Sequence, residues 1–232
     1  MITIGISRSD SKFQNYINWL EAADISYRIF DWEKSGDVEM LSECSGLILT
    51  GGSDIYPEVY CDWDTPDMKG KYLPERDGYE LNLLSKALDL KMPVFGICRG
   101  LQLINVYFRG SLIFDIEDIR KVNHRKIAEN TDRMHLINIF PDTLLSEIMK
   151  ESKVEVNSSH HQAADRTGEG LMINCRSEDG IVEGLEYADK KEKSFLIAVQ
   201  FHPERFPERI ADTPKKLLDR FVKECYNYAK RI

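Results

Sequence analysis

The sequence predicts an α/β protein with an open, mostly parallel sheet flanked by helices and a small added antiparallel portion. In the first half of the chain, short apolar runs alternate with stretches of helical spacing, the pattern of a parallel sheet with crossover helices. In the second half, short apolar runs follow one another with few helices between them, which favours antiparallel strands. A length of 232 residues suffices for one sizeable core, so we expect a single domain over residues 1–232.

The first half of the chain is expected to hold four strands and three helices. The strands are Thr3–Ser7, Tyr27–Trp32, Gly46–Thr50 and Pro93–Ile97. The helices are Phe13–Ala23, Asp77–Leu90 and Leu101–Phe108, with apolar residues three or four positions apart. The fourth strand runs directly into Cys98, so this cysteine is expected between a strand and a helix.

The second half is expected to hold five short strands and a closing helix. The strands are His135–Phe140, Val154–Asn157, Leu171–Cys175, Ile181–Tyr187 and Phe195–Phe201, and the helix is Pro214–Ala229. Two stretches are expected to be loops: Ser53–Glu75, rich in Pro, Asp and Tyr, and Ile116–Arg133, rich in charge.

Composition argues against several classes of protein. Hydrophobic residues make up 42% and charged residues 30% of the chain, as in a soluble globular protein. No apolar run approaches the roughly 18 residues that a membrane helix needs, and no signal peptide is recognisable, so a cytoplasmic location is expected. The net charge of -8 gives no basic face for nucleic acid. The five cysteines are odd in number and lack CxxC spacing, which argues against disulfides and a zinc ribbon.

Cys98 lies in the turn Gly96-Ile97-Cys98-Arg99-Gly100, which has the form of a nucleophile elbow with Cys in place of Ser. Flanking glycines leave room for a strained turn, and the thiol would lie at a helix N-terminus, where the free N–H groups favour a thiolate. The alternative is a buried structural cysteine at the end of a core strand.

A second apolar strand ends in His202-Pro203-Glu204. Residues two apart on a strand point the same way, so Glu204 can orient the ring of His202. A thiol nucleophile needs a base held in this manner. Because strand C-termini of an open α/β sheet converge on one crevice, we expect His202 to meet Cys98 there.

The pair Gly51-Gly52 follows a third strand and exposes backbone N–H groups of the kind an oxyanion hole requires. The N–H of Arg99, next to the nucleophile, would be the partner of the Gly52 N–H. The alternative is an ordinary tight turn.

The block Asn157-Ser158-Ser159-His160-His161-Gln162 contains adjacent histidines. Adjacent side chains diverge on a strand and no acidic cluster stands nearby in the sequence, so we expect this loop to contact substrate and not a metal ion.

These motifs resemble the class I glutamine amidotransferase superfamily and, within it, the γ-glutamyl-γ-aminobutyrate hydrolase branch, peptidase family C26. The matching stretches are LTGGSDIYPEVY, PVFGICRGLQLINV, VNSSHHQA, DGIVEGLE and AVQFHPE, in the order of that family. The resemblance implies a flavodoxin-like fold, a Cys98-His202-Glu204 triad and no metal or organic cofactor. It also implies that Gln102, Ser159 and His160 contact the glutamyl substrate.

The resemblance implies hydrolysis of a γ-glutamyl amide through a γ-glutamyl thioester, with release of glutamate and an amine or amidate. The chain departs from the family pattern at Arg109–Leu112 and Ser53–Pro57, which leaves the leaving group open. Arg109 and Arg205, together with Arg99, would favour an anionic or nucleotide-linked leaving group such as a γ-glutamyl phosphoramidate. The alternative for Arg109 and Arg205 is that both face solvent. The alternatives for the protein are an amidotransferase subunit that supplies ammonia to a separate synthetase, and a binding protein without activity. The sequence leaves the oligomeric state open, a homodimer included.

Overall fold

A computed structural model describes residues 2–34, 37–61, 70–207 and 212–231 of the chain. The strands are β1 (Thr3–Ser7), β2 (Ser26–Phe30), β3 (Gly46–Leu49), β4 (Val94–Ile97), β5 (Leu112–Ile113), β6 (Arg133–Ile139), β7 (Lys153–Ser158), β8 (Ala163–Ala164), β9 (Leu171–Ser177), β10 (Val182–Tyr187) and β11 (Leu196–Val199). The helices are α1 (Phe13–Ala22), α2 (Pro74–Asp89), α3 (Arg99–Tyr107), α4 (Ile116–Arg120), α5 (Leu144–Met149) and α6 (Asp212–Ala229), with 3₁₀ turns η1 (Val38–Glu43), η2 (Pro57–Val59) and η3 (Pro203–Arg205).

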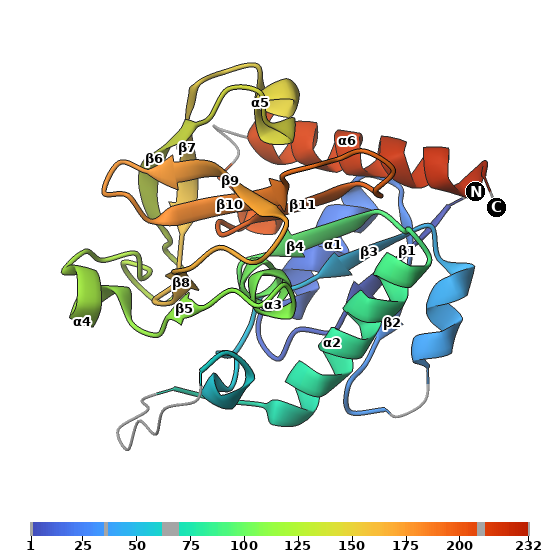
Figure 1. Ribbon diagram of the computed structural model, residues 1–232, viewed down its shortest axis with the longest axis horizontal. Helices are drawn as coiled ribbons and strands as arrows, with labels where there is room; N and C mark the ends of the chain where they lie inside the picture. The colour runs from blue at the N-terminus through green and yellow to red at the C-terminus, as the bar shows by residue number, and fades with distance from the viewer. Residues whose placement is uncertain (1, 35–36, 62–69, 208–211, 232) are drawn as a thin grey trace.

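One continuous sheet runs through both halves of the described chain, in the order β2-β1-β3-β4-β11-β10-β9-β6-β7 (Figure 1). The pairs from β2 to β11 are parallel, and the pairs from β11 to β7 are antiparallel. The predicted α/β fold is therefore confirmed. A separate short pair, β5 with β8, lies outside this sheet.

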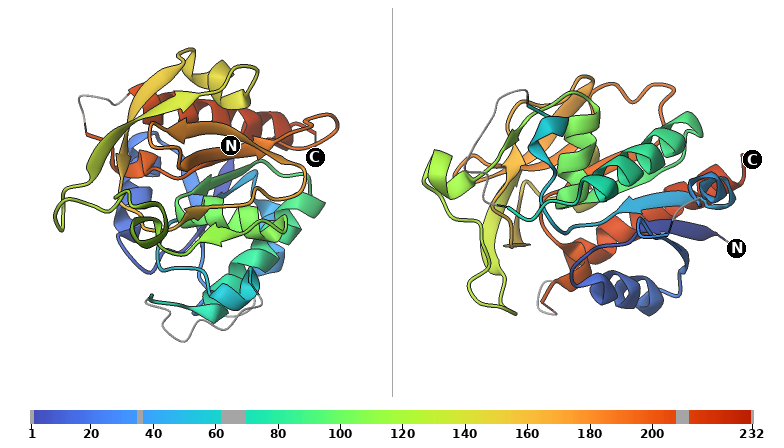
Figure 2. Two further views of the ribbon diagram at one scale, coloured as in Figure 1. Left: turned by 60° about the vertical axis from the view of Figure 1, so that its left-hand side comes forward. Right: turned by 90° about the horizontal axis from the view of Figure 1, so that it is seen from below.

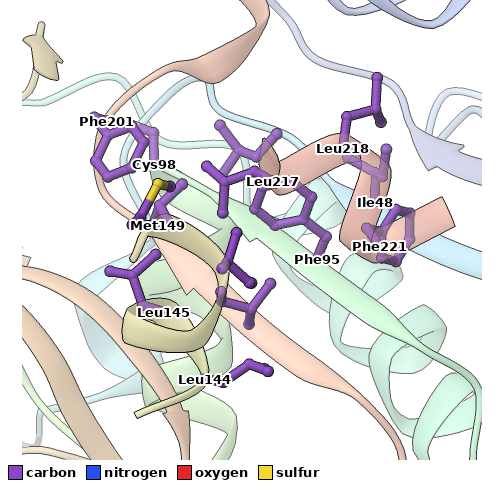
Figure 3. Close-up of a cluster of buried hydrophobic side chains, with 14 of the residues drawn as sticks. Ile48, Phe95, Cys98, Leu144, Leu145, Met149, Phe201, Leu217, Leu218 and Phe221 are labelled. Atoms are coloured by element: carbon purple, nitrogen blue, oxygen red, sulfur yellow. The ribbon is translucent and has the colours of Figure 1, made fainter. Parts of the chain in front are cut away.

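Helices cover both faces of the sheet, because side chains of its central strands alternate between two cores. On β3 and β4, Ile48 and Phe95 face one core with α1, α5 and α6, whereas Leu47 and Val94 face a second core with α2 and α3. Figure 2 shows these layers, with α1 and α6 on the opposite side of the sheet from α2 and α3. Figure 3 shows the first core, which reaches as far as Cys98.

Each of the nine predicted strands is found in the large sheet, with its ends displaced by at most two residues. Helix α2 begins three residues earlier than predicted, at Pro74, because proline suits the first turn of a helix, where its missing N–H costs nothing. Part of the expected loop Ser53–Glu75, residues 62–69, lies outside the described residues.

Two short helices were not predicted. The expected loop Ile116–Arg133 contains α4, whose first turn is capped by the Asp115 side chain accepting the Asp118 N–H at 3.1 Å. Helix α5 is capped by Thr143, whose side chain accepts the Ser146 N–H at 3.1 Å. Both helices are too short for an apolar period to repeat, so caps were the only sequence signal for them.

The C-terminal ends of β3, β4 and β11 lie side by side at one edge of the sheet, because β4 pairs with both of its neighbours in parallel. These three strands lead into Gly51-Gly52, Cys98 and His202 respectively. The sheet thus brings the three predicted motifs together. Among the described residues, no helix is long and apolar enough to cross a membrane.

Candidate active site

Cys98 occupies a strained position between β4 and α3. Its φ of 52° and ψ of -103° lie outside the regions that non-glycine residues prefer, at a cost of about 1–3 kcal/mol. The backbone N–H of Cys98 donates to Val199 O at 2.8 Å, and its carbonyl accepts the first N–H groups of α3, from Leu101 and Gln102. The sheet and the helix therefore fix the strained residue from both sides.

The two glycines of the turn are required by close packing. A Cβ on Gly96 would lie 2.9 Å from the Gly100 carbonyl oxygen, and a Cβ on Gly100 would overlap the Leu49 carbonyl oxygen. Helix α3 can therefore approach the ends of β3 and β4 only because both positions lack a side chain.

The other described buried thiols have different surroundings. Burial raises the pKa of Cys44 to about 11 and raises that of Cys175 and Cys225 well above the ordinary range of a thiol. Cys98, although only 7% exposed, has two polar partners: it accepts the Gln200 Nε2 amide at 3.4 Å and is hydrogen-bonded to the His202 ring. Amide and imidazole donors favour a thiolate.

His202 lies between Cys98 and Glu204. Its Nδ1 is 2.9 Å from Glu204 Oε1, so contact with the thiol falls to Nε2. Its backbone is fixed by Asn157, whose side chain accepts the His202 N–H at 2.9 Å and donates to the His202 carbonyl at 3.0 Å. The two residues of the predicted His-x-Glu motif do face each other, across η3.

Electrostatics favour a protonated His202. Burial lowers the pKa of His202, but the Glu204 carboxylate and the Cys98 sulfur raise it by more than burial lowers it, to about 9. Burial raises the pKa of Glu204, but His202 more than offsets this effect and holds it below its usual value. The arrangement therefore suits an imidazolium that bridges a thiolate and a carboxylate.

Gly51 and Gly52 lie next to the Cys98–His202 pair. A Cβ on Gly51 would be 3.2 Å from His202 Cε1 and 3.6 Å from Cys98 Cβ, so only a glycine leaves space there. The Gly51 N–H is bonded to Tyr16 Oη at 2.9 Å, and Gly52 has a φ of 138°, which favours glycine. The N–H of Arg99 opens helix α3, before its first intrahelical donor, Leu101.

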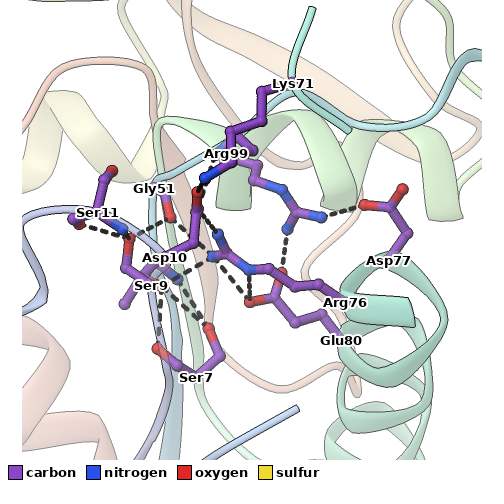
Figure 4. A network of polar contacts seen from close by, with 12 residues as sticks. Ser7, Ser9, Asp10, Ser11, Gly51, Lys71, Arg76, Asp77, Glu80 and Arg99 are labelled. Carbon is purple, nitrogen blue, oxygen red and sulfur yellow. Dashed lines mark hydrogen bonds and ion pairs between the residues drawn. The ribbon is translucent and has the colours of Figure 1, made fainter. Parts of the chain in front are cut away.

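The side chain of Arg99 was expected toward the crevice, and this expectation was wrong. Its guanidinium is buried and forms ion pairs with Asp77 and Glu80 of α2. We call the buried group that contains it the arginine network (Figure 4). The network consists of Arg76, Asp77, Glu80, Arg99 and Asp10.

Within this network, Arg76 connects helix α2 to the Gly51 loop. It donates to Glu80 Oε1 at 3.0 Å, to Asp10 Oδ1 at 2.7 Å and to the Gly51 carbonyl at 2.7 Å. Asp10 in turn accepts the Ser53 N–H at 2.9 Å. The network thus holds the Gly51-Gly52 turn against the helix that carries Arg99.

Gln102 is connected to the thiol through Gln200, a residue that sequence reasoning missed. Gln102 Nε2 donates to the Gln162 carbonyl at 3.1 Å and to Gln200 Oε1 at 3.2 Å, and Gln200 donates to Cys98. Gln200 stands two residues before His202, and the alternation of a strand could have indicated that both side chains face the thiol. Asn157 was also missed, although it lies in a recognised motif.

The loop after β7 differs from expectation. Ser159 is half-buried, but the ring of His160 is turned toward Glu183 and not toward Cys98, with Nε2 3.4 Å from Glu183 Oε1. No acidic cluster stands near the histidines in the sequence, but the fold brings Glu183 beside His160. His160 reaches the thiol region only indirectly, because its Nδ1 lies 2.9 Å from the Gln162 carbonyl that Gln102 also contacts.

The two arginines expected near the leaving group differ from each other. The Arg109 side chain is 80% exposed and lies 4.0 Å from Glu169, so this arginine faces solvent. Arg205 is largely buried, with Nε 3.0 Å from Asp132 Oδ2 and 3.9 Å from Glu204 Oε1. It lines a cavity of ≈ 540 Å³ together with Lys12.

The family model for peptidase C26 matches residues 14–204 of the chain, a span that includes Cys98, His202 and Glu204. The chain belongs to the peptidase C26 family. It is thus a hydrolase of the glutamine amidotransferase-like kind.

Similarity to individual proteins agrees with membership of the C26 family. The chain is 37% identical over 187 residues to protein NtpR of Enterococcus hirae, covering 79% of this chain and 76% of that protein. It is 30% identical over 199 residues to the γ-glutamyl-γ-aminobutyrate hydrolase PuuD of Escherichia coli, covering 82% and 75%. A crystal structure of a glutamine amidotransferase from Thermotoga maritima superposes with a TM-score of 0.61 at 18% identity over 100% and 86% of the two chains, which shows a shared fold.

Proposed function

We propose that this chain cleaves γ-glutamyl amide bonds through a Cys98-His202-Glu204 triad. The observation that carries the proposal is the position of His202, which is bonded to Glu204 at 2.9 Å and to a thiol held on a strained elbow. A nucleophile, a base and a group that orients the base are the parts that acyl transfer requires. The relationship to a γ-glutamyl-γ-aminobutyrate hydrolase supports the choice of acyl group.

In the first step, the Cys98 thiolate attacks the γ-carbonyl carbon and forms a C–S bond. The oxygen of the tetrahedral intermediate accepts the backbone N–H groups of Gly52 and Arg99. The His202 imidazolium then gives its proton to the departing nitrogen as the C–N bond breaks, which leaves a γ-glutamyl thioester and a free amine or amidate.

In the second step, water attacks the thioester. Neutral His202 takes a proton from the water, the C–S bond breaks, and glutamate leaves while the thiolate is restored. Glu204 stays ionised and holds the ring in place throughout. Gln102 is suited to contact the glutamyl group, because its amide is fixed beside the thiol by Gln162 and Gln200.

For the leaving group, we propose an anionic substituent on the nitrogen, a carboxylate or a phosphate, held in the cavity that Lys12 and Arg205 line. That cavity borders the residues that fix His202, because Asn157 lines it as well. Guanidinium and ammonium groups pair well with carboxylate or phosphate. Arg109 has no part in this proposal, because it faces solvent.

The test is a panel of γ-glutamyl conjugates with cationic, neutral, carboxylate and phosphate-bearing leaving groups, compared by kcat/KM for released glutamate. We expect Cys98→Ala to lower turnover by several orders of magnitude in a folded protein. Lys12→Ala should remove the preference for an anionic leaving group, and Arg109→Ala, the matched control, should keep it. A preference for a cationic conjugate would refute the leaving-group proposal alone.

The same panel separates hydrolysis from ammonia supply. If glutamine were the best substrate, and its hydrolysis rose on addition of a synthetase chain, the protein would be an amidotransferase subunit. Full turnover in Cys98→Ala would overturn the triad, whatever the substrate.

A further inference from the structure

Three histidines and a glutamate from four separate segments meet behind the loop after β7. They are His124, from the segment after α4; His135, from β6; His160, from the loop after β7; and Glu183, from β10. We call this group the histidine cluster. The side chains of His124, His160 and Glu183 are at most 2% exposed and that of His135 is 16% exposed, so the cluster is nearly closed to solvent.

In two of the three rings, contacts outside the cluster indicate which nitrogen carries the hydrogen when the ring is neutral. His160 Nδ1 lies 2.9 Å from the Gln162 carbonyl, which can only accept, so Nδ1 carries the hydrogen and Nε2 presents a lone pair. His124 Nε2 lies 3.0 Å from Asp179 Oδ2, so its Nδ1 presents a lone pair. A ring whose second nitrogen donates to a carbonyl or a carboxylate is the usual form of a metal-binding histidine.

One nitrogen of each ring lies close to the same carboxylate oxygen. Glu183 Oε1 lies 3.2 Å from His124 Nδ1, 3.3 Å from His135 Nε2 and 3.4 Å from His160 Nε2. His124 Nδ1 and His160 Nε2 are 3.3 Å apart. Ligand atoms of a tetrahedral zinc ion, with bonds of about 2.0–2.1 Å, are separated by about 3.3–3.4 Å. Four separations among these atoms thus match the spacing of zinc ligands, and atoms of His124, His135 and Glu183 all lie within 4.8 Å of one another.

The charges of the cluster also call for a cation. Glu183 Oε1 faces three ring nitrogens at 3.2–3.4 Å, but among the described residues none of these contacts has the geometry of a good hydrogen bond. A fully buried carboxylate that is not well hydrogen-bonded needs a compensating positive charge. With three neutral rings, one divalent cation would balance the charges of Glu183 and Asp179.

We propose that His124, His135, His160 and Glu183 bind a structural Zn²⁺ ion. Imidazole nitrogens and a carboxylate oxygen are ligand types that zinc prefers, and atoms of His124, His135 and Glu183 all lie within 4.8 Å of one another, with His160 3.4 Å from Glu183. The ion would fasten the loop after β7 to β6 and β10. Because the His160 ring bonds Gln162, which contacts Gln102, it would also position the polar residues beside Cys98.

The test is the metal content of the full-length protein, measured by mass spectrometry after growth with zinc and gel filtration. We expect about one zinc ion per chain, as for a structural site that is part of the fold. The measurement is repeated in Cys98→Ala, because the active-site thiol can itself bind zinc. Cobalt reloading of the chelated Cys98→Ala protein should give the visible bands of tetrahedral Co²⁺.

Zinc content should fall at least tenfold in His124→Ala and in Glu183→Gln. His161→Ala is the matched control, because His161 is adjacent in sequence but contacts Asp54 and Asp115 instead, and its content should be unchanged. Chelation of the unmutated chain provides a readout that does not depend on whether these variants fold. Absence of zinc from the wild type, with no uptake on reloading, would overturn the proposal. So would zinc that is lost in Cys98→Ala and kept in His124→Ala.

Discussion

The arginine network and the histidine cluster are two buried groups of polar residues on either side of Cys98, and they balance their charges in different ways. In the arginine network, the guanidinium groups of Arg76 and Arg99 lie against Asp10, Asp77 and Glu80, and the ammonium of Lys71 completes the balance at 3.0 Å from Asp10. In the histidine cluster, three imidazole nitrogens face one carboxylate. Side chains alone balance the charges of the arginine network, whereas those of the histidine cluster leave room for a cation.

This difference bears on how each side of the active site is held. The arginine network fixes the Gly51 loop by hydrogen bonds within the protein, which form whenever it folds. The proposed zinc ion would fix the opposite side, at His160, only when it is bound. The rigidity of the two sides should therefore respond to different conditions, and the following predictions test that.

The largest effect is expected from Glu80→Gln in the arginine network. Glu80 contacts both Arg76 and Arg99 and is fully buried, so the substitution leaves buried positive charge uncompensated and should cost about 3–5 kcal/mol of unfolding free energy. Urea unfolding measures it. Glu39→Gln, which removes an exposed partner of Lys86, should change stability by less than about 1 kcal/mol. An equal loss of unfolding free energy in the two variants would show that Glu80 does not stabilise Arg76 and Arg99 more than an exposed ion pair would.

Chelation should act on the histidine cluster alone. We expect removal of zinc to lower Tm by roughly 5–10 °C, because an ion that binds only the folded state stabilises it. The same decrease is expected in the Glu80→Gln background, since distant sites without shared partners act additively. A decrease that is also seen in Glu183→Gln would assign the chelator effect to another part of the molecule.

Gln200→Ala should have a smaller effect, on activity. Loss of the amide that donates to the thiol at 3.4 Å should reduce kcat/KM about tenfold, the equivalent of one hydrogen bond to a charged group. Stability should change little in comparison with Glu80→Gln. An unchanged rate of Cys98 alkylation in Gln200→Ala would show that this contact does not favour the thiolate.

The smallest change is expected in the pH profile. The pKa of His202 is raised to about 9, so the imidazolium that protonates the leaving nitrogen is present below pH 9 and is lost above it. The kcat/KM profile should therefore fall on its alkaline side near pH 9. In Glu204→Gln this fall should move to lower pH, because the carboxylate raises the pKa. The Arg109→Ala profile serves as the reference. An alkaline fall that stays near pH 9 in Glu204→Gln would contradict the assignment of this pKa to His202.

The strands and the motifs at their ends could be predicted because each is local. The apolar run before Cys98 and the alternation around His202 depend on adjacent residues only, and these determined both the sheet and the position of the site. The side chain of Arg99 could not be predicted in this way, because Asp77 and Glu80 come from a helix about twenty positions earlier in the chain.

The histidine cluster escaped prediction for a related reason. Its members are spread from residue 124 to residue 183, and no two of them have the short spacing of a metal motif. The adjacent pair of histidines was recognised, but His161 takes no part in the cluster. The association of His135 with Glu183 depends on the pairing of β6, β9 and β10, which only the folded sheet shows.

The place of β11 in the sheet has a consequence for how the protein is made. This strand is the last of the described strands along the chain, yet it lies in the interior of the sheet, between β4 and β10. A nascent chain that has only reached α3 contains Cys98 but neither Gln200 nor His202, and its sheet is open beside β4. The thiol would thus acquire its partners only after the segment that contains Gln200 and His202, about a hundred residues later, has been synthesised. A growing or truncated chain would carry an ordinary cysteine, and reactivity would begin with the completed fold.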